Sequence, residues 1–150
     1  MSGGWLDPRT LLPGLRGHRL HVVASADEAR LRAALASAGV AIFTLAGRGI
    51  TGESTLFEEV ARALGLGDDF GRNWDALADV LSDLEEHTAP RLAVVWVDAD
   101  LSLKADLQTF LSAVLALAAA ADDLATAGEP ERAKQLEVFV LGAGAGFPGA

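Results

Sequence analysis

The sequence predicts an α/β fold in which a small, mainly parallel sheet of three or four strands is flanked by helices. Four short apolar runs, rich in β-branched residues, have the length and composition of strands. They are 19–24, 40–45, 92–97 and 136–141. Helical patterns lie between them, and strands that alternate with helices are typical of parallel sheets. The runs Ala93 to Val97 and Val138 to Leu141 are wholly apolar, which predicts central strands covered on both faces.

Four helices are expected around these strands. Two of them open with a capping box, in which a Ser or Thr is followed three residues later by Glu. These are Ser25 with Glu28 and Thr55 with Glu58. Glycines that can adopt left-handed backbone angles stop both helices. The expected ranges are 25–37 before Gly39, 55–64 before Gly65, a helix from Trp74, and an alanine-rich helix at about 104–127.

One domain accounts for most of the chain, because 150 residues suffice for a single core. We expect this domain to span residues 19–141, with an irregular arm over 1–18 and a glycine-rich tail over 142–150. The first strand and helix, 19–37, are expected to add an extra N-terminal βα unit to the edge of the sheet.

Composition restricts the function. The chain has no cysteine, which excludes disulfides, thiolate metal sites and a cysteine nucleophile. Its net charge of −9 repels nucleic-acid phosphates and favours basic protein partners, although many proteins are acidic for solubility alone. No secretory signal opens the sequence, and the longest apolar run, Leu111 to Ala121, is too short to span a bilayer. We therefore expect a cytoplasmic protein that binds neither nucleic acid nor membrane.

The stretch from Phe70 to Leu81 carries the most specific pattern. Asn73 is a good N-cap for a helix that begins at Trp74, and Gly71 permits a tight backbone path into that helix. An apolar stripe and an acidic stripe occupy different sides of the helix. The apolar stripe is Trp74, Leu77, Val80, Leu81 and Leu84, and the acidic stripe is Asp75, Asp79, Asp83 and Glu86. Like charges four residues apart destabilise a helix by roughly 0.2–0.5 kcal/mol per pair, so this stripe favours a cationic partner.

The same stretch resembles the signature of the barstar-type ribonuclease inhibitors. Their pattern is aromatic-Gly-x-Asn-x-Asp-Ala-Leu followed by a second Asp. Here it reads Phe70-Gly71-Arg72-Asn73-Trp74-Asp75-Ala76-Leu77, with Asp79 as the second acid. The resemblance spans about Val40 to Leu141. It implies an inhibitor that covers the active site of a small, basic, secreted-type ribonuclease (barnase-like or related) and mimics its RNA substrate.

The resemblance also implies roles for individual residues. Asp79 would take the position of an RNA phosphate, Asp75 would contact a neighbouring cation or amide, and Asn73 with its neighbours would shape the loop. The implied partner-binding residues are Asp69, Phe70, Gly71, Asn73, Trp74, Asp75, Ala76, Asp79 and Asp83. No catalytic residue, cofactor or metal is implied. The chain departs from the family at Asp69 and Ala78, where aromatic residues are usual, and over 114–120, where no acid is available for a further contact.

Other functions stay open at this stage. One is a non-inhibitory interaction or regulatory module on the same fold. Another is nucleotide binding through Gly47 to Gly52, but Glu53 stands where a phosphate-binding lysine is required and no second Rossmann strand follows. Metal binding by the acidic stripe is less favoured, because one helix supplies only one side of a coordination shell. The histidines at 18, 21 and 87 have no acidic partner nearby in sequence, so we expect satisfied or exposed side chains.

Overall fold

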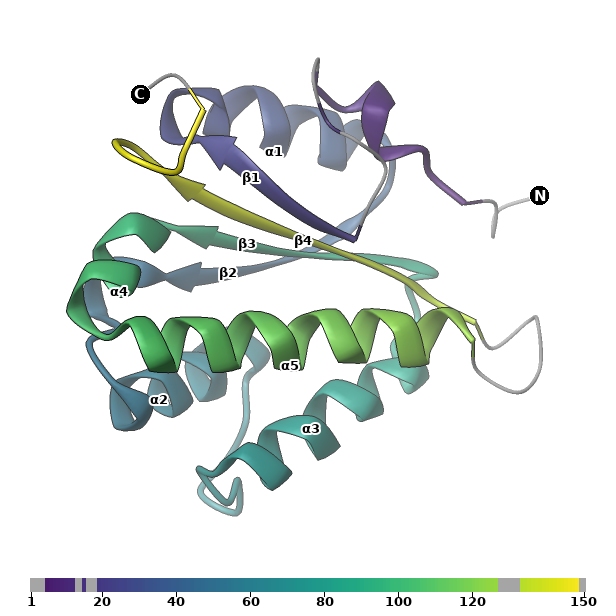
Figure 1. Cartoon of the computed structure of the whole chain (residues 1–150). Coiled ribbons are helices and arrows are strands. Elements are labelled where there is room, and N and C mark those ends of the chain that lie inside the picture. Colours follow the sequence, from purple (N-terminus) through teal and green to yellow (C-terminus); the bar gives the residue numbers. More distant parts are fainter. Residues whose placement is uncertain (1–4, 13–14, 16–18, 127–132, 149–150) are drawn as a thin grey trace.

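The computed structural model of this chain describes residues 5–12, 15, 19–126 and 133–148. Its four strands form one parallel sheet in the order β1-β4-β3-β2 (Figure 1). The strands are β1 (Leu20–Ala24), β2 (Ala41–Ala46), β3 (Arg91–Val97) and β4 (Gln135–Gly142). The helices are α1 (Glu28–Ser37), α2 (Glu53–Leu64), α3 (Trp74–Ser82), α4 (Ala99–Ala105) and α5 (Leu107–Ala125). This confirms the α/β class, the parallel sheet and the extra βα unit, which is β1 at the sheet edge together with α1.

Helices cover both faces of the sheet, and each face has its own core. α2, α3 and α5 lie on one side and α1 on the other (Figure 1). Alternation along β4 divides its side chains between the two cores. Leu136 and Val138 enter the larger core under α5, whereas Phe139 and Leu141 pack in the smaller core with α1. β3 and β4 are therefore the central strands, as their apolar sequences predicted.

The stops of the first two helices are confirmed, but their starts differ from the prediction. Gly39 and Gly65 have left-handed φ angles of 73° and 67°. A 3-10 turn, η2 (Ser25–Asp27), precedes α1. α2 begins at Glu53, two residues before the predicted start. Thr55 is therefore the third residue of the helix rather than its cap. The Thr55 hydroxyl accepts a hydrogen bond from the backbone N–H of residue 52 (3.0 Å), which is the reverse half of a capping box.

The alanine-rich helix predicted at about 104–127 corresponds to α5, and the short helix α4 before it was not predicted. α4 follows β3 directly and ends before Asp106. The Asp106 carboxylate then caps α5 by accepting a hydrogen bond from the Thr109 amide (3.1 Å), and this bonding lowers the pKa of Asp106. α4 was missed because it is only seven residues long and alternates apolar with polar residues, a pattern that lacks the helical period.

Close packing requires glycine at position 47. Gly47 opens the 3-10 turn η3 (Gly47–Gly49) directly after β2. A Cβ there would lie 2.4 Å from the Val97 carbonyl oxygen and 2.6 Å from that of Asp98, so a larger residue cannot fit without movement of the backbone. The Gly47 carbonyl accepts a hydrogen bond from the buried Ser102 hydroxyl (2.8 Å). The turn therefore joins the carboxyl ends of β2 and β3 to α4.

A buried polar cluster links β1, β4 and the N-terminal arm. His21 Nε2 lies 2.6 Å from a carboxylate oxygen of Glu137, and both residues are buried. Gln135 donates to the other oxygen of Glu137 (3.1 Å). The side-chain amide of Gln135 also bonds the backbone N–H and C=O of Leu6 (2.6 Å each). His21 is therefore satisfied, which is one of the two expected outcomes, and its acidic partner is distant in sequence.

The arm and the tail both contribute to packing. The arm forms the 3-10 turn η1 (Pro8–Thr10), and Leu11 and Leu12 are buried in the smaller core. After β4, the buried Phe147 closes over Gly142, where a Cβ would lie 2.7 Å from the ring. The remaining parts of the predicted arm and tail, 1–4, 13–14, 16–18 and 149–150, lie outside the described residues.

α5 is long and apolar enough, by length and composition alone, to cross a membrane. In this fold its buried side, which includes Phe110, Ala113 and Leu117, packs against β4 and α3. A core helix passes the same test of composition. The absence of a membrane partner stays a prediction.

Candidate functional site

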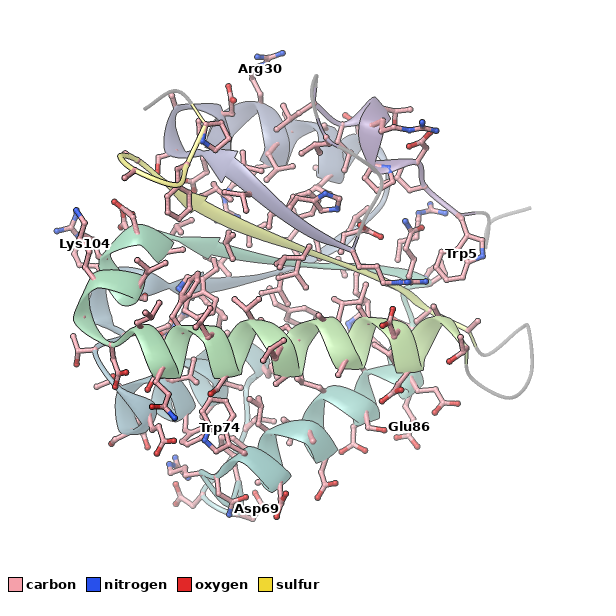
Figure 2. The ribbon with its side chains drawn as sticks, viewed as in Figure 1. Trp5, Arg30, Asp69, Trp74, Glu86 and Lys104 are labelled. Atoms are coloured by element: carbon pink, nitrogen blue, oxygen red, sulfur yellow. The ribbon has the colours of Figure 1, made fainter. Side chains whose placement is uncertain are left out.

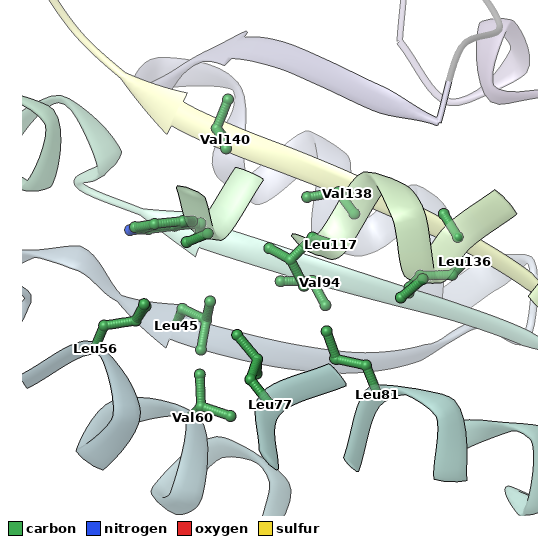
Figure 3. Packing of buried hydrophobic residues seen from close by; sticks show 14 of the residues in the cluster. Leu45, Leu56, Val60, Leu77, Leu81, Val94, Leu117, Leu136, Val138 and Val140 are labelled. Carbon is green, nitrogen blue, oxygen red and sulfur yellow. The ribbon is translucent and has the colours of Figure 1, made fainter. Parts of the chain in front are cut away.

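α3 separates apolar from acidic side chains as its sequence predicted. Leu77 and Leu81 are each only 2% exposed and point from α3 towards the sheet (Figure 3). Leu84, in the 3-10 turn η4 (Asp83–Glu86) that continues the helix, is also buried. This packing fixes the rotation of α3, so the opposite side of the helix faces solvent.

Asn73 holds the start of α3 and the preceding loop together. Its Oδ1 accepts a hydrogen bond from the Ala76 amide (2.8 Å), which confirms the predicted N-cap. Its Nδ2 donates to the Gly71 carbonyl (3.1 Å). A Cβ at Gly71 would lie 3.1 Å from that of Ala76, so glycine allows this close approach. The unusual backbone angle lies one residue later than expected, at Arg72 with a φ of 48°.

Arg72 ties the loop to α2. Its guanidinium donates to the Glu58 carboxylate and to the Phe70 carbonyl (2.9 Å), and the bond with Glu58 raises the pKa of Arg72. Phe70 is buried and meets Phe57 of α2 edge-on. Phe70 therefore shapes the loop and has little surface left for a partner.

Trp74 makes a second connection to α2. Its indole N–H donates to the Glu53 carboxylate (2.7 Å), and its ring contacts Phe57 edge-on with ring centres 5.1 Å apart. The side chain is half-buried. Glu53, which occupies the position of a phosphate-binding lysine in the disfavoured nucleotide motif, thus holds the first residue of α3. The loop and the start of α3 are fixed in place by α2.

The carboxylates of Asp75, Asp79 and Asp83 are exposed. Within the described part of the chain, no Lys, Arg or His nitrogen forms an ion pair with any of them. In contrast, Glu58 and Glu59 of α2 each bind an arginine. The acids of α2 hold the structure together, whereas those of α3 are available to an external cation.

A hollow of about 290 Å³ lies between the loop and α3. It combines apolar and acidic side chains, among them Leu66, Ala76 and Val80 with Asp69, Asp79 and Asp83. A lysine or arginine of a partner could place its aliphatic stem on the apolar part and its charged head among the carboxylates.

A second hollow, of about 140 Å³, lies between α3 and α5 beside Ala78. Small side chains of α5, including Ala116 and Ala119, line it, so the space stays open. Asp123 also lines this hollow. The segment 114–120 itself supplies no acid, as its sequence indicated, and the acid that α5 contributes to this hollow is Asp123, just beyond that segment.

Six of the nine predicted partner-binding residues line the hollow between the loop and α3, namely Asp69, Phe70, Gly71, Ala76, Asp79 and Asp83, although Phe70 is buried. Asp69 lies at one end of this loop-and-α3 surface, and Glu86, which was not predicted to bind a partner, lies beyond its other end along the lower side of Figure 2. Arg72, Glu58 and Glu53 support this surface but were not predicted. The only sequence signal was that Arg72 is the single basic residue between Asp68 and Glu86.

Two further expectations concern metals and histidines. Among the described residues, no group of three His, Cys, Asp or Glu side chains is placed to hold a metal ion, and the absence of a metal stays a prediction. His87 accepts a hydrogen bond from the Ala89 amide (2.9 Å), so it is satisfied locally as expected. His18 lies outside the described residues.

A parallel α/β domain whose rigid loop and acidic helix face solvent has the architecture of a barstar-like protein. The family model described as Barstar (barnase inhibitor) matches residues 40–139 of this chain, and the chain therefore belongs to the barstar family. The match includes the entire candidate surface and begins after β1 and α1, so the N-terminal unit precedes the matched region. A search of curated proteins found no match.

Proposed function

We propose that this protein inhibits a small basic ribonuclease of the barnase type by covering its active site with the 69–73 loop and α3. Membership of the barnase-inhibitor family supports this function at the level of the family. The observation that carries the proposal for this chain is the row of exposed carboxylates at Asp75, Asp79 and Asp83, which have no cationic partner within the described residues. We also propose that inhibition takes place in the cytoplasm.

The protein inhibits by occupying the active-site cleft of the ribonuclease, and no chemical step is involved. A ribonuclease cleft contains cations that bind RNA phosphates, and Asp79, the middle acid of the row, takes the position of one phosphate. Asp75 and Asp83 lie one helical turn to either side and extend the negative charge along the cleft. Because α2 already holds the loop through Arg72 and Trp74, less conformational entropy is lost on binding. The net charge of −9 accelerates encounter with a basic enzyme.

The test is an RNA-cleavage assay with a barnase-type ribonuclease titrated by wild type and single variants. We expect Asp79→Ala to weaken inhibition most, by roughly 2–5 kcal/mol, because the cations of the enzyme are left buried and unpaired. That range is the general one for truncated buried charge pairs, and the barnase–barstar complex is itself among the measured cases behind it. Asp75→Ala should weaken inhibition less. Folding stability should stay unchanged, since both side chains are exposed.

Asp27→Ala is the control, because it removes the same charge next to α1, on the other face of the sheet, where the carboxylate makes only a surface ion pair with Arg30 (3.6 Å). Asp106 is unsuitable as a control, since its carboxylate caps α5. Added salt should lower the association rate more than it raises the dissociation rate. Equal inhibition by wild type, Asp75→Ala, Asp79→Ala and Asp27→Ala would show that the acidic surface is only solvated and that another surface inhibits. No inhibition by any of the four would favour the non-inhibitory interaction module.

A further inference from the structure

α5 carries a row of exposed leucines that the fold itself does not use. Leu107, Leu111 and Leu115 are 54%, 49% and 69% exposed. They are spaced by four residues and therefore lie on one side of the helix. The buried side of α5 is made by other residues, such as Phe110 and Leu117. We call these three residues the leucine row.

The stretch of α5 that carries the leucine row is itself uncharged. No Asp, Glu, Lys or Arg occurs from Leu107 to Ala121, a stretch of about 20 Å at the rise of an α-helix. Scattered exposed leucines are normal on a protein surface, but three in succession on an uncharged helix form a continuous apolar strip. α5 runs across the front of the molecule in Figure 1, with α3 below it. The leucine row is therefore distinct from the acidic side of α3.

Charge decides which partner suits this strip. A basic enzyme is attracted to the acidic surface of α3 and gains nothing electrostatically from an uncharged helix. A second copy of this chain carries the same charge of −9 and is repelled wherever acidic surfaces meet. At the uncharged strip of α5, two copies can approach each other without bringing charges of that helix together.

We propose that two copies associate through their α5 helices, packed antiparallel across a two-fold axis. An isologous contact requires the same patch to complement itself. The leucine row satisfies this requirement because it is symmetric about its middle residue: Leu111 lies near the axis, and Leu107 of each copy meets Leu115 of the other. Spacing by four residues forms the ridge that interdigitates in the commonest class of helix packing. The acidic surfaces of both copies stay accessible.

The size of the strip sets the strength of the association. A standard interface buries on the order of 800 Å² per partner, and three partly exposed leucines with neighbouring alanines supply less than that. The dimer is therefore weak and reversible, and it is populated only as the protein concentration rises. Dimerisation does not depend on inhibition of a nuclease.

Sedimentation equilibrium from micromolar to near-millimolar protein tests the proposal. We expect a reversible monomer–dimer equilibrium for wild type, and an association constant at least tenfold lower for Leu115→Glu. Ala33→Glu is the matched control, because it adds the same charge at an exposed position of α1 on the other side of the sheet. It should dimerise like wild type. Circular dichroism should show that both variants are folded.

Single cysteines provide an independent measurement, since the natural chain has none. Leu111→Cys places a thiol beside the proposed axis and should form a disulfide-linked dimer much faster than Ala33→Cys under the same mild oxidation. A wild type that stays monomeric at the highest concentration would overturn the proposal, as would equal cross-linking of the two cysteine variants. If Leu115→Glu dimerises normally but inhibits a ribonuclease less well, the leucine row contacts the enzyme and the proposal is wrong.

Discussion

Replacing Leu81 by alanine should destabilise the domain strongly and leave its acidic surface unchanged. Leu81 is 2% exposed and belongs to the larger core, where its neighbours include Leu77, Val94 and Leu117. It is one of two leucines that fix the rotation of α3. The experiment therefore tests the packing that turns Asp75 and Asp79 towards solvent.

The expected loss can be worked out from the core. The substitution removes three carbon atoms, whose transfer to the core stabilises folding by roughly 0.8 kcal/mol each, or about 2.4 kcal/mol together. The space left behind costs roughly 24 cal/mol per Å³ of cavity, so a residual cavity of ~40–70 Å³ adds about 1–1.7 kcal/mol. A small hollow of about 20 Å³ already lies beside Leu81, which shows that the neighbouring side chains do not close the space. We expect a total of about 3–4 kcal/mol.

Urea unfolding followed by circular dichroism measures this loss. Leu115→Ala is the matched control, because it removes the same atoms from a side chain that is 69% exposed, and it should change the unfolding free energy by less than about 0.5 kcal/mol. Asp79→Ala should be neutral or slightly stabilising, because it relieves repulsion between acids four residues apart. If Leu81→Ala costs less than about 1 kcal/mol, α3 does not pack through this side and its aspartates are not held towards solvent as described.

Two further predictions concern the supports of the fold. Gly47→Ala should destabilise the domain by about 1–3 kcal/mol through overpacking, because its Cβ would lie 2.4 Å from the Val97 carbonyl oxygen. Gly49→Ala is the control, since its Cβ would meet nothing within 4 Å, and equal stability of the two variants would contradict the packing role. Neither variant should alter the heats measured with ATP or NAD in calorimetry. The hydrogen bond from Arg62 lowers the pKa of Glu59, so Glu59 stabilises the fold above the ordinary glutamate pKa of about 4.3, and this contribution is lost as the pH falls through the lowered pKa. Glu59→Gln should therefore be less stable than wild type at pH 7 and approach it below about pH 4 in urea titrations, and a difference that stays constant with pH would refute this role.

The elements of the fold were predictable from the sequence because their signals are local. The strand from Leu92 to Val97 is apolar at every position, which only a strand covered on both faces tolerates. The cap at Asn73 and the glycine stops depend on dihedral angles and hydrogen bonds within one turn. The same holds for the opposite faces of α3, whose leucines and aspartates follow the period of the helix. α4 was missed because its seven residues alternate between apolar and polar types and therefore lack the helical period.

The supports of the site were not predictable, because each joins residues that are distant in sequence. Arg72 reaches Glu58 on another helix, and the indole of Trp74 reaches Glu53, 21 residues away. His21 finds its partner 116 residues later, at Glu137. No periodicity or capping rule links such positions, since their proximity arises only when the sheet and helices pack.

The sequence by itself therefore determined the class of fold, the order of its elements, the family and the acidic face of α3, because these follow from helical period, strand composition and contiguous motifs. Only the tertiary structure decided which acids are available and which are engaged. Glu53, Glu58 and Glu59 look no different in sequence from the acids of α3, but packing places an indole or a guanidinium against each of them. A carboxylate can bind an external cation only when its own fold has not already supplied a partner.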